Sequence, residues 1–152
     1  MALENVRSAH NVGSIFRTAD GAGAMEVHLI GTTPAPIDRF GRPQPDIAKT
    51  ALGAERTLPW TYHESAAAFL EEVRTRGTAL IVAEQDARAV DYRTLVHEGD
   101  LLLVFGNEVE GVSEALRDEA AEIVHIPMRG TKESLNVSVA AGVVLFALAE
   151  HH

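Results

Sequence analysis

The chain has 152 residues, of which 46% are hydrophobic and 23% charged, the balance of one folded globular domain rather than of a disordered or fibrous protein. It contains no cysteine, which excludes a disulfide framework, a thiolate metal site and a cysteine nucleophile. No apolar run approaches the roughly 20 residues of a membrane span and no signal peptide opens the sequence, so we expect a cytoplasmic protein without a membrane segment.

The formal net charge of −9 comes from the middle of the chain. Residues 57–125 hold 14 acidic against 5 basic side chains, whereas residues 1–56 hold 6 of each and residues 126–152 hold 2 of each. This distribution disfavours tight nonspecific binding to nucleic acid, but it leaves room for a specific site near the two ends of the chain.

The first third of the sequence predicts strand, helix and strand, followed by a long loop. A short strand lies in Ala2–Val6, and a helix begins at Asn11 as N-cap and ends at Gly21 or Gly23. Alternation of apolar and polar residues predicts a strand over Met25–Gly31. Thr32–Pro45 is rich in proline and carries Arg39 and Arg42, and a loop of that length in a compact domain is often functional.

The rest of the chain continues the alternation of helices and strands. Short helices are expected over Asp46–Leu52 and after Ser113, a longer one over Ser65–Arg76, and an extended piece over Thr57–Tyr62, while Val90–His97 is ambiguous. Continuous apolar runs predict buried strands over Thr78–Ala83, Leu101–Phe105 and Glu122–Ile126. This order predicts an α/β fold, a mostly parallel sheet flanked by helices.

The segment Ile126–Leu148 is the most distinctive part of the chain. From Val137 it is apolar all round up to Glu150, so the helix that it forms should be buried or lie at a subunit interface. Ser134, Asn136 and Ser138 stand at its start, where side-chain oxygens favour a helix N-terminus and polar groups suit a ligand site. An ordinary core helix with a polar cap is the alternative.

Common enzyme motifs are missing. Gly106 to Gly111 has the outer glycines of a P-loop but lacks the following Lys-Ser/Thr, and Gly21-Ala-Gly-Ala follows a helix rather than the strand of a dinucleotide-binding fingerprint. There is no Gly-x-Ser-x-Gly elbow. No histidine pair has metal-ligand spacing apart from His151–His152, which we interpret as a possible tag remnant, so we expect no metal.

Three stretches in order, HNVGSIFRTADGAGA, VFGNEVEGVS and IPMRGTKESLNVSVAAGVVL, resemble the motifs of the SpoU (TrmH-type) RNA 2′-O-methyltransferases of the SPOUT superfamily. The resemblance spans Val6 to Leu148, and KTALGAE between the first two motifs is also similar. It implies one methyltransferase domain over residues 1–150, with a C-terminal deep trefoil knot, a rare exception to the rule against knots.

The resemblance also implies S-adenosylmethionine as the cofactor, held in a bent form largely by backbone groups. By motif position, the cofactor-binding residues would be Ala83, Gly106, Ile126, Met128 and Leu135. Backbone N–H and C=O groups beside apolar side chains suit adenine, which is flat and apolar with a hydrogen-bonding edge. Gly106 and Gly130 would permit close backbone approach.

The catalytic residues implied by motif position are Asn11, Arg17, Glu108, Ser134 and Asn136. Arg17 would hold the substrate phosphate and stabilise the developing alkoxide of a ribose 2′-hydroxyl, with the proton acceptor left open because an arginine is a demanding base. Taken singly, each residue also has a plain structural interpretation, such as an ion pair of Arg17 with Asp20 or a solvated turn at Glu108.

The implied partners are an RNA substrate, tRNA or rRNA, and a second copy of the chain. Homodimerisation would use the C-terminal and first helices, with Leu135, Val139, Gly142 and Phe146 on one helix face. The sequence starts almost at the first motif, so RNA capture would fall to this domain itself. A non-catalytic knotted protein that binds RNA or assists assembly is the alternative function.

Overall fold

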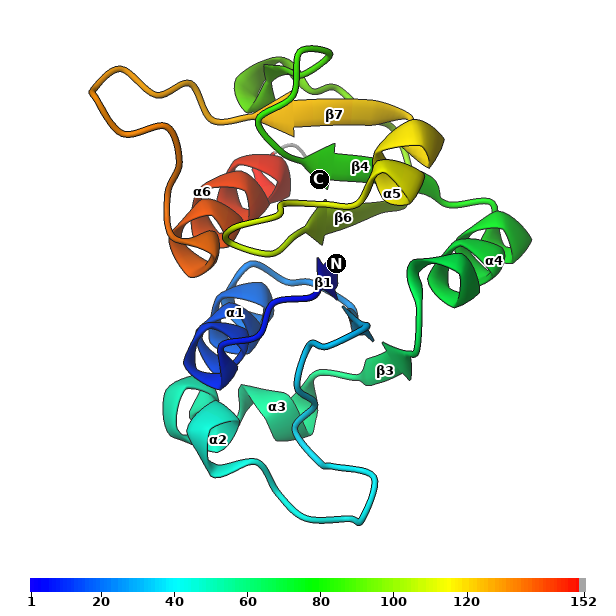
Figure 1. The fold of residues 1–152 in the computed structure, drawn as a ribbon, viewed down its shortest axis with the longest axis vertical. Helices are drawn as coiled ribbons and strands as arrows, with labels where there is room; N and C mark the ends of the chain where they lie inside the picture. The colour runs from blue at the N-terminus through cyan, green and yellow to red at the C-terminus, as the bar shows by residue number, and fades with distance from the viewer. Residues whose placement is uncertain (151–152) are drawn as a thin grey trace.

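The computed structural model describes residues 1–150, so the predicted tag remnant His151–His152 lies outside them. A seven-stranded sheet in the order β3-β2-β1-β6-β4-β7-β5 forms the centre of the molecule (Figure 1), and every strand pair in it is parallel. The strands are β1 Ala2–Glu4, β2 Val27–Ile30, β3 Trp60–His63, β4 Ala79–Ala83, β5 Val90–Asp91, β6 Leu101–Phe105 and β7 Glu122–His125. The predicted α/β fold with a parallel sheet is confirmed.

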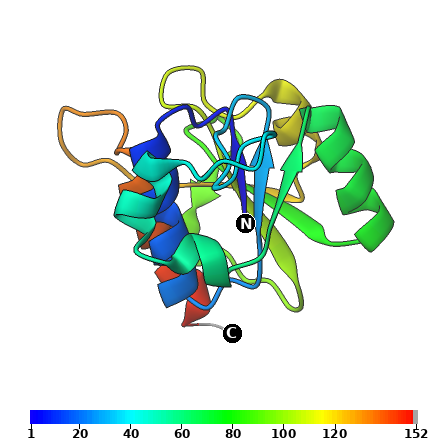
Figure 2. The same ribbon diagram turned by 90° about the horizontal axis from the view of Figure 1, so that it is seen from below.

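Helices cover both faces of this sheet (Figure 2). They are α1 Ala9–Gly21, α2 Pro45–Ala51, α3 Ala54–Thr57, α4 Ala66–Arg76, α5 Glu114–Glu119 and α6 Val137–Ala149, with a 3-10 turn at Tyr92–Thr94. The core on one face joins α1, α2, α3 and α6 to the strands, and the core on the other face joins α4 and α5 to them. No helix within residues 1–150 is long and apolar enough to cross a membrane.

Local sequence explains where most of these helices begin and end. Ser65 caps α4 by accepting a hydrogen bond from the Ala68 nitrogen, and Gly77 ends it in a left-handed conformation. The expected N-cap of α1 is wrong: Ser8 caps this helix by accepting from the Asn11 nitrogen, and Asn11 lies inside the first turn. The side chain of Asn11 is therefore available for contacts outside its own helix.

The parallel arrangement brings all the loops that follow strands to one edge of the sheet. In Figure 2 the loops after β2 and β6 lie at the top, and the loop after β7, in orange, extends to the upper left. Ligands of open parallel sheets bind outside the carboxyl ends of the strands, so this edge is where a site is expected.

Candidate functional site

A cavity of about 310 Å³ lies at the carboxyl ends of β4, β6 and β7. Such a volume is at the lower end of the range for small-molecule sites, about 300–1,000 Å³. Its walls come from the strand ends, from the loops after β6 and β7, and from one side of α6, which contributes Val137, Ala140 and Val144. The lining combines apolar side chains with exposed backbone and a few polar groups, and so suits a ligand with a flat apolar part and polar edges.

Two glycines allow the loop after β6 to fold tightly against the sheet. A Cβ atom on Gly106 would lie 2.4 Å from the carbonyl carbon of Gly111 and from the nitrogen of Val112. Gly111 has φ of +70°, and a Cβ there would lie 2.2 Å from the carboxylate of Glu84. Side chains at either position would push the loop away from the cavity that it lines.

Asn107 fixes the same loop from within. Its side chain is buried, the amide nitrogen donates to the Asn5 carbonyl oxygen at 2.8 Å, and the amide oxygen accepts from the nitrogens of Val109 and Glu110. The loop conformation is thereby tied to the segment after β1. A preorganised loop of this kind can present its backbone groups to a ligand with little further loss of conformational entropy.

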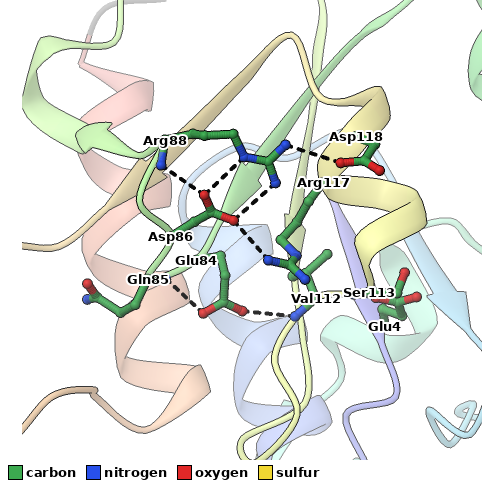
Figure 3. A network of polar contacts seen from close by, with 9 residues as sticks. All are labelled: Glu4, Glu84, Gln85, Asp86, Arg88, Val112, Ser113, Arg117 and Asp118. Atoms are coloured by element: carbon green, nitrogen blue, oxygen red, sulfur yellow. Dashed lines mark hydrogen bonds and ion pairs between the residues drawn. The ribbon is translucent and has the colours of Figure 1, made fainter.

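Two carboxylates complete the support of this loop (Figure 3). Glu84 accepts from the nitrogens of Gln85 and Val112, and Glu4, which is 3% exposed, accepts from the nitrogen of Ser113 at 2.7 Å. Hydrogen bonds from backbone N–H groups to a carboxylate are charge-assisted and therefore stronger than neutral ones. Glu4 is an anchor beneath the site, whereas Glu84 supports the loop and also lines the cavity.

An ion-pair network continues this support toward α5 (Figure 3). Asp86 pairs with Arg88 and Arg117, and Arg88 reaches Asp118. Hydrogen bonds from Arg88 and then from Arg117 hold the pKa of the Asp86 carboxyl well below its ordinary range. Asp86 is therefore charged at neutral pH and links the loop after β4 to α5.

A chain of polar side chains joins the three sequence motifs. The Asn11 amide nitrogen donates to a Glu108 carboxylate oxygen at 3.1 Å, and the Asn136 amide nitrogen donates to the Asn11 amide oxygen at 3.4 Å. Asn136 also caps α6 by accepting from the backbone nitrogen and the hydroxyl of Ser138. Asn11 thus meets Glu108, 97 positions away, and Asn136, 125 positions away, at the N-terminus of α6.

Arg17 lies apart from these hydrogen-bonded side chains. It is exposed on α1, six residues beyond Asn11, which places it about 9 Å further along the helix axis. Within residues 1–150 it makes no ion pair, and the alternative pairing with Asp20 is not present. Like Asn11 and Asn136 it does not line the cavity of its own chain, and within residues 1–150 no side-chain hydrogen bond joins it to the other predicted catalytic residues.

The structure gathers most of the other predicted site residues at one place. The residues that line the cavity are Ala83, Gly106, Glu108, Ile126, Met128, Ser134 and Leu135, so all the predicted cofactor-binding residues are among them. A Cβ atom on Gly130 would meet nothing within 4 Å among the described residues, in contrast to Gly106. The close approach of both glycines to a bound cofactor stays a prediction.

Sequence reasoning missed the residues that support the loops, namely Glu4, Glu84, Gln85 and Asn107. The Gln85 amide nitrogen donates to the Ile126 carbonyl oxygen at 3.1 Å and so connects the loops after β4 and β7. One signal was available for Glu84, a charged residue placed directly after the buried run TALIVA. A carboxylate at the end of a buried strand needs partners, and backbone N–H groups of the neighbouring loop supply them.

A second polar cluster lies away from this edge, under α4. The Nδ1 atom of His28 on β2 is 3.0 Å from the Nε2 atom of His63 on β3, and the same His63 nitrogen is 3.6 Å from Glu72. The three side chains are close enough together to hold a metal ion, a grouping that the sequence spacing did not indicate. The two facing ring nitrogens are at hydrogen-bond distance, which favours one shared proton between two buried imidazoles.

Comparisons with known proteins identify the family. The sequence profile of the SpoU rRNA Methylase family matches residues 1–146. A 23S rRNA (guanosine-2′-O-)-methyltransferase, RlmB, from Ralstonia nicotianae is 39% identical over 150 residues, which cover 96% of this chain and 56% of that protein. The chain spans little more than half the length of the curated relatives that it matches most strongly.

Solved structures agree with the sequence match. The AdoMet-bound rRNA methyltransferase from Sinorhizobium meliloti superposes with a TM-score of 0.89 at 32% identity, over 99% of this chain and 55% of that chain. A structure concerned with 2′-OH methylation of C/U34 on tRNA superposes with a TM-score of 0.74 at 31% identity, over 99% of this chain and 91% of that chain. Sequence and fold together show that the chain belongs to the SpoU rRNA methylase family.

Proposed function

We propose that the protein is an RNA methyltransferase that transfers a methyl group from S-adenosylmethionine to a ribose 2′-hydroxyl. The observation that carries this proposal is the meeting of the three motifs at one edge of the sheet, where Glu108, Asn11 and Asn136 are hydrogen-bonded beside a cavity of ligand size. Family membership supports the same chemistry, since its relatives include 23S rRNA (guanosine-2′-O-)-methyltransferases.

The cavity fits S-adenosylmethionine. Its apolar wall of Ile126, Met128 and Leu135 suits the adenine ring, and the tightly folded loop from Gly106 to Gly111 offers backbone groups to the polar parts. Ala83 and Gly106 would flank the ligand from the ends of β4 and β6. Relatives of known structure include methyltransferases with bound AdoMet.

The chain's own residues would bind and orient the RNA. Bound S-adenosylmethionine supplies a methyl group on a positively charged sulfur, and the 2′-hydroxyl becomes a useful nucleophile only as its proton is removed. Arg17 would bind the neighbouring phosphate and stabilise the developing alkoxide. Asn11 and Asn136 would orient the hydroxyl, Ser134 would contact the ligand from the third motif, and Glu108 would hold Asn11 in place.

Arg17 can serve this chemistry only if a second subunit supplies the rest of the site, since it lies away from the cavity of its own chain. We therefore infer a homodimer through α6 and α1. The apolar side chains Val139 and Phe146 are 52% and 50% exposed on α6, and the Phe146 ring lies near Gly21 at the end of α1. A partner helix packed there would cover both side chains and bring Arg17 of one chain toward the cavity of the other.

Three further expectations belong to the same proposal. The loop from Ile126 to Asn136, which returns to α6 beside the loop after β6, would form the trefoil knot. Residues 1–150 would act as one methyltransferase domain. A ribosomal RNA substrate, in line with the activity for which the relatives are named, would place the protein in the cytoplasm, with tRNA as the second substrate class.

Two measurements on the purified chain test the proposal. Calorimetry with S-adenosylmethionine and with S-adenosylhomocysteine should show one site per chain, and tritium transfer from labelled S-adenosylmethionine to ribosomal RNA should appear as 2′-O-methylated nucleosides on digestion. Cofactor binding and RNA binding without transfer to rRNA or tRNA would favour the non-catalytic alternative. No heat with either compound on folded protein would refute the cofactor site.

A further inference from the structure

A second cavity of about 440 Å³ lies at the edge of the sheet formed by β2 and β3. Trp60 and Tyr62 of β3 form one wall, and the segment from Thr33 to Arg39 of the long loop forms the other. The Tyr62 hydroxyl donates to the Gly31 carbonyl oxygen at 2.7 Å, which fixes the orientation of its ring. Nothing in the chemistry proposed above uses this cavity.

Hydrogen bonds within the loop beside the cavity fix its conformation. Its tip closes through a bridge between Ile37 and Pro43, and the Asp38 carboxylate accepts from the backbone nitrogens of Phe40 and Arg42. The Arg42 side chain donates to the same carboxylate at 2.8 Å. These bonds hold the tip in one shape without the help of the core, so its exposed side chains are presented in a fixed way.

The tip presents an aromatic ring with two cations. Phe40 is 67% exposed, and the guanidinium carbons of Arg39 and Arg42 lie 4.8 Å and 5.0 Å from the centre of its ring. Arg42 is neutralised by Asp38, whereas Arg39 makes no ion pair with any residue of the described part of the chain. Arg39 also lines the cavity, so a free positive charge stands at the entrance of an aromatic pocket.

We propose that this pocket receives one unpaired base of the RNA substrate, stacked on Trp60 or Tyr62, with Arg39 on its phosphate and Phe40 against the next base. Aromatic rings and arginine planes are the surfaces on which proteins stack splayed-out RNA bases, and such stacking tolerates any base because every base has a π-face. An anion alone would not need the aromatic wall of this pocket. The indole N–H of Trp60, which donates to no acceptor within residues 1–150, could bond to the edge of such a base.

The position of the pocket agrees with this role. Its loop residues, Thr33 to Arg39, follow β2 and so leave the sheet at the carboxyl edge, where the cofactor cavity also lies, while Trp60 and Tyr62 lie on the edge strand β3. β3 is four places from β4 in the strand order, about 19 Å at the usual spacing between strands. A few nucleotides of single-stranded RNA span such a distance, so the pocket can set which ribose reaches the cofactor cavity. The inference rests on the proposed function in taking RNA as the ligand.

The single tryptophan of the sequence is Trp60, and it makes the proposal directly testable. An unpaired RNA oligonucleotide is titrated into the chain while Trp60 fluorescence and the anisotropy of a label on the RNA are both followed. We expect the fluorescence to be quenched with the same dissociation constant that anisotropy reports. The matching duplex RNA should leave the fluorescence unchanged. Unchanged fluorescence while the single-stranded RNA binds would overturn the proposal.

Exposed variants with matched controls complete the test. Arg39→Ala and Phe40→Ala should each weaken binding of the single-stranded RNA about tenfold, since stacking on one side chain contributes that much or more. Arg56→Ala removes an equally exposed arginine, and Leu52→Ala removes a side chain that is also 67% exposed, so both should stay within about twofold. Equal losses in the controls would contradict the assignment to this pocket.

The outcomes separate this inference from the function on which it rests. Cofactor binding and methyl transfer with RNA affinity insensitive to Arg39→Ala and Phe40→Ala would leave the methyltransferase standing and remove the pocket. RNA-dependent quenching without cofactor binding would keep the pocket and remove the methyltransferase. If Phe40→Ala instead dissociates a dimer in sedimentation and leaves RNA affinity unchanged, the tip is a protein interface and the proposal is wrong.

Discussion

At the scale of single residues, the shape of the site depends on a glycine, which leaves room that a side chain would fill. Gly106 has no side chain where a Cβ would lie 2.4 Å from the backbone of Gly111 and Val112. Gly130, in the loop after β7, has open space at the corresponding point. The two glycines of the candidate site therefore make opposite predictions for the same substitution.

Gly106→Ala should displace the loop after β6, lowering S-adenosylmethionine affinity tenfold or more and stability by about 1–3 kcal/mol, as overpacking does. Gly130→Ala is the control and should change stability by less than about 0.5 kcal/mol. Urea unfolding and calorimetry on both variants measure the two effects. An equal response of the two variants would show that the loop tolerates a side chain at Gly106.

Arg17 does not line the cavity of its own chain, so its proposed role in catalysis needs a direct test. Arg17→Ala should lower methyl transfer at least about a hundredfold through the lost charge-assisted contacts to phosphate and alkoxide, and leave cofactor affinity within a few-fold. Arg56→Ala, another exposed arginine, should keep full activity. Radiolabelled transfer to a confirmed substrate RNA is the measurement, and full activity of Arg17→Ala would remove this residue from the site.

Sequence reasoning reached some of these residues and missed others for physical reasons. Residues at motif positions, such as Ile126 and Leu135, line the cavity because a parallel sheet gathers the loops after its strands at one edge. The N-cap of α1 was misplaced because Ser8 and Asn11 both favour that position, and only the helix geometry decides between them. The supporting role of Glu4 could not be predicted from the sequence, because the Ser113 nitrogen that donates to it lies 109 residues away.

At the scale of elements, the alternation of helices and strands could be predicted, but the order of strands in the sheet could not. The apolar runs of β4, β6 and β7 indicate buried parallel strands, yet nothing local says that β6 lies between β1 and β4. The His28–His63 contact could not be predicted for the same reason, because it arises from the pairing of β2 with β3. Histidine spacing along the chain carries no information about such a pair.

The buried histidine pair predicts how stability depends on pH. Burial lowers the pKa of both imidazoles below their ordinary value, opposed by Glu26 at His28 and by Glu72 at His63. The amino group of Met1 and the His63 imidazole also lower the pKa of His28, whereas Arg76 lowers and Glu26 raises that of His63. Phe69 packs against both rings. Below about pH 6.5 the unfolded chain therefore binds protons that the folded chain does not.

The contribution of the two histidines to stability should accordingly be full above about pH 6.5 and fall as the pH drops below it, by up to about 1.4 kcal/mol per pH unit for each imidazole that stays neutral. Burial also lowers the pKa of the Met1 amino group from 8.0 to about 6, which adds a slope between these pH values that does not depend on histidine. Urea unfolding at pH 7.5, 6.5 and 5.5 measures this slope. His63→Gln removes one titrating group and should flatten the slope, while His10→Gln, at an exposed position, should not. A slope that is unchanged in His63→Gln would assign the pH dependence to other groups.

At the scale of the whole molecule, α6 is the main surface of the proposed homodimer. The helix is apolar all round, and its Val137, Ala141, Val144 and Leu148 are buried against the sheet. Val139 and Phe146, two helical turns apart, remain half exposed on the side that adjoins α1. Exposed apolar side chains gathered on one face are typical of a partner surface, and this supports the homodimer proposed above, in which Arg17 of α1 would serve the cavity of the other subunit.

Phe146→Glu should therefore separate the dimer and abolish methyl transfer together, because a buried unpaired charge at an interface is strongly unfavourable. Cofactor binding should persist in the resulting monomer, since the cavity lies within one chain. Val96→Glu places the same charge at a side chain that is 88% exposed on another part of the surface, and should leave both assembly and activity intact. Sedimentation velocity at micromolar concentration, run beside the transfer assay, measures both properties. A Phe146→Glu protein that is still a dimer, or a monomer that is still fully active, would show that the catalytic site does not depend on this face of α6.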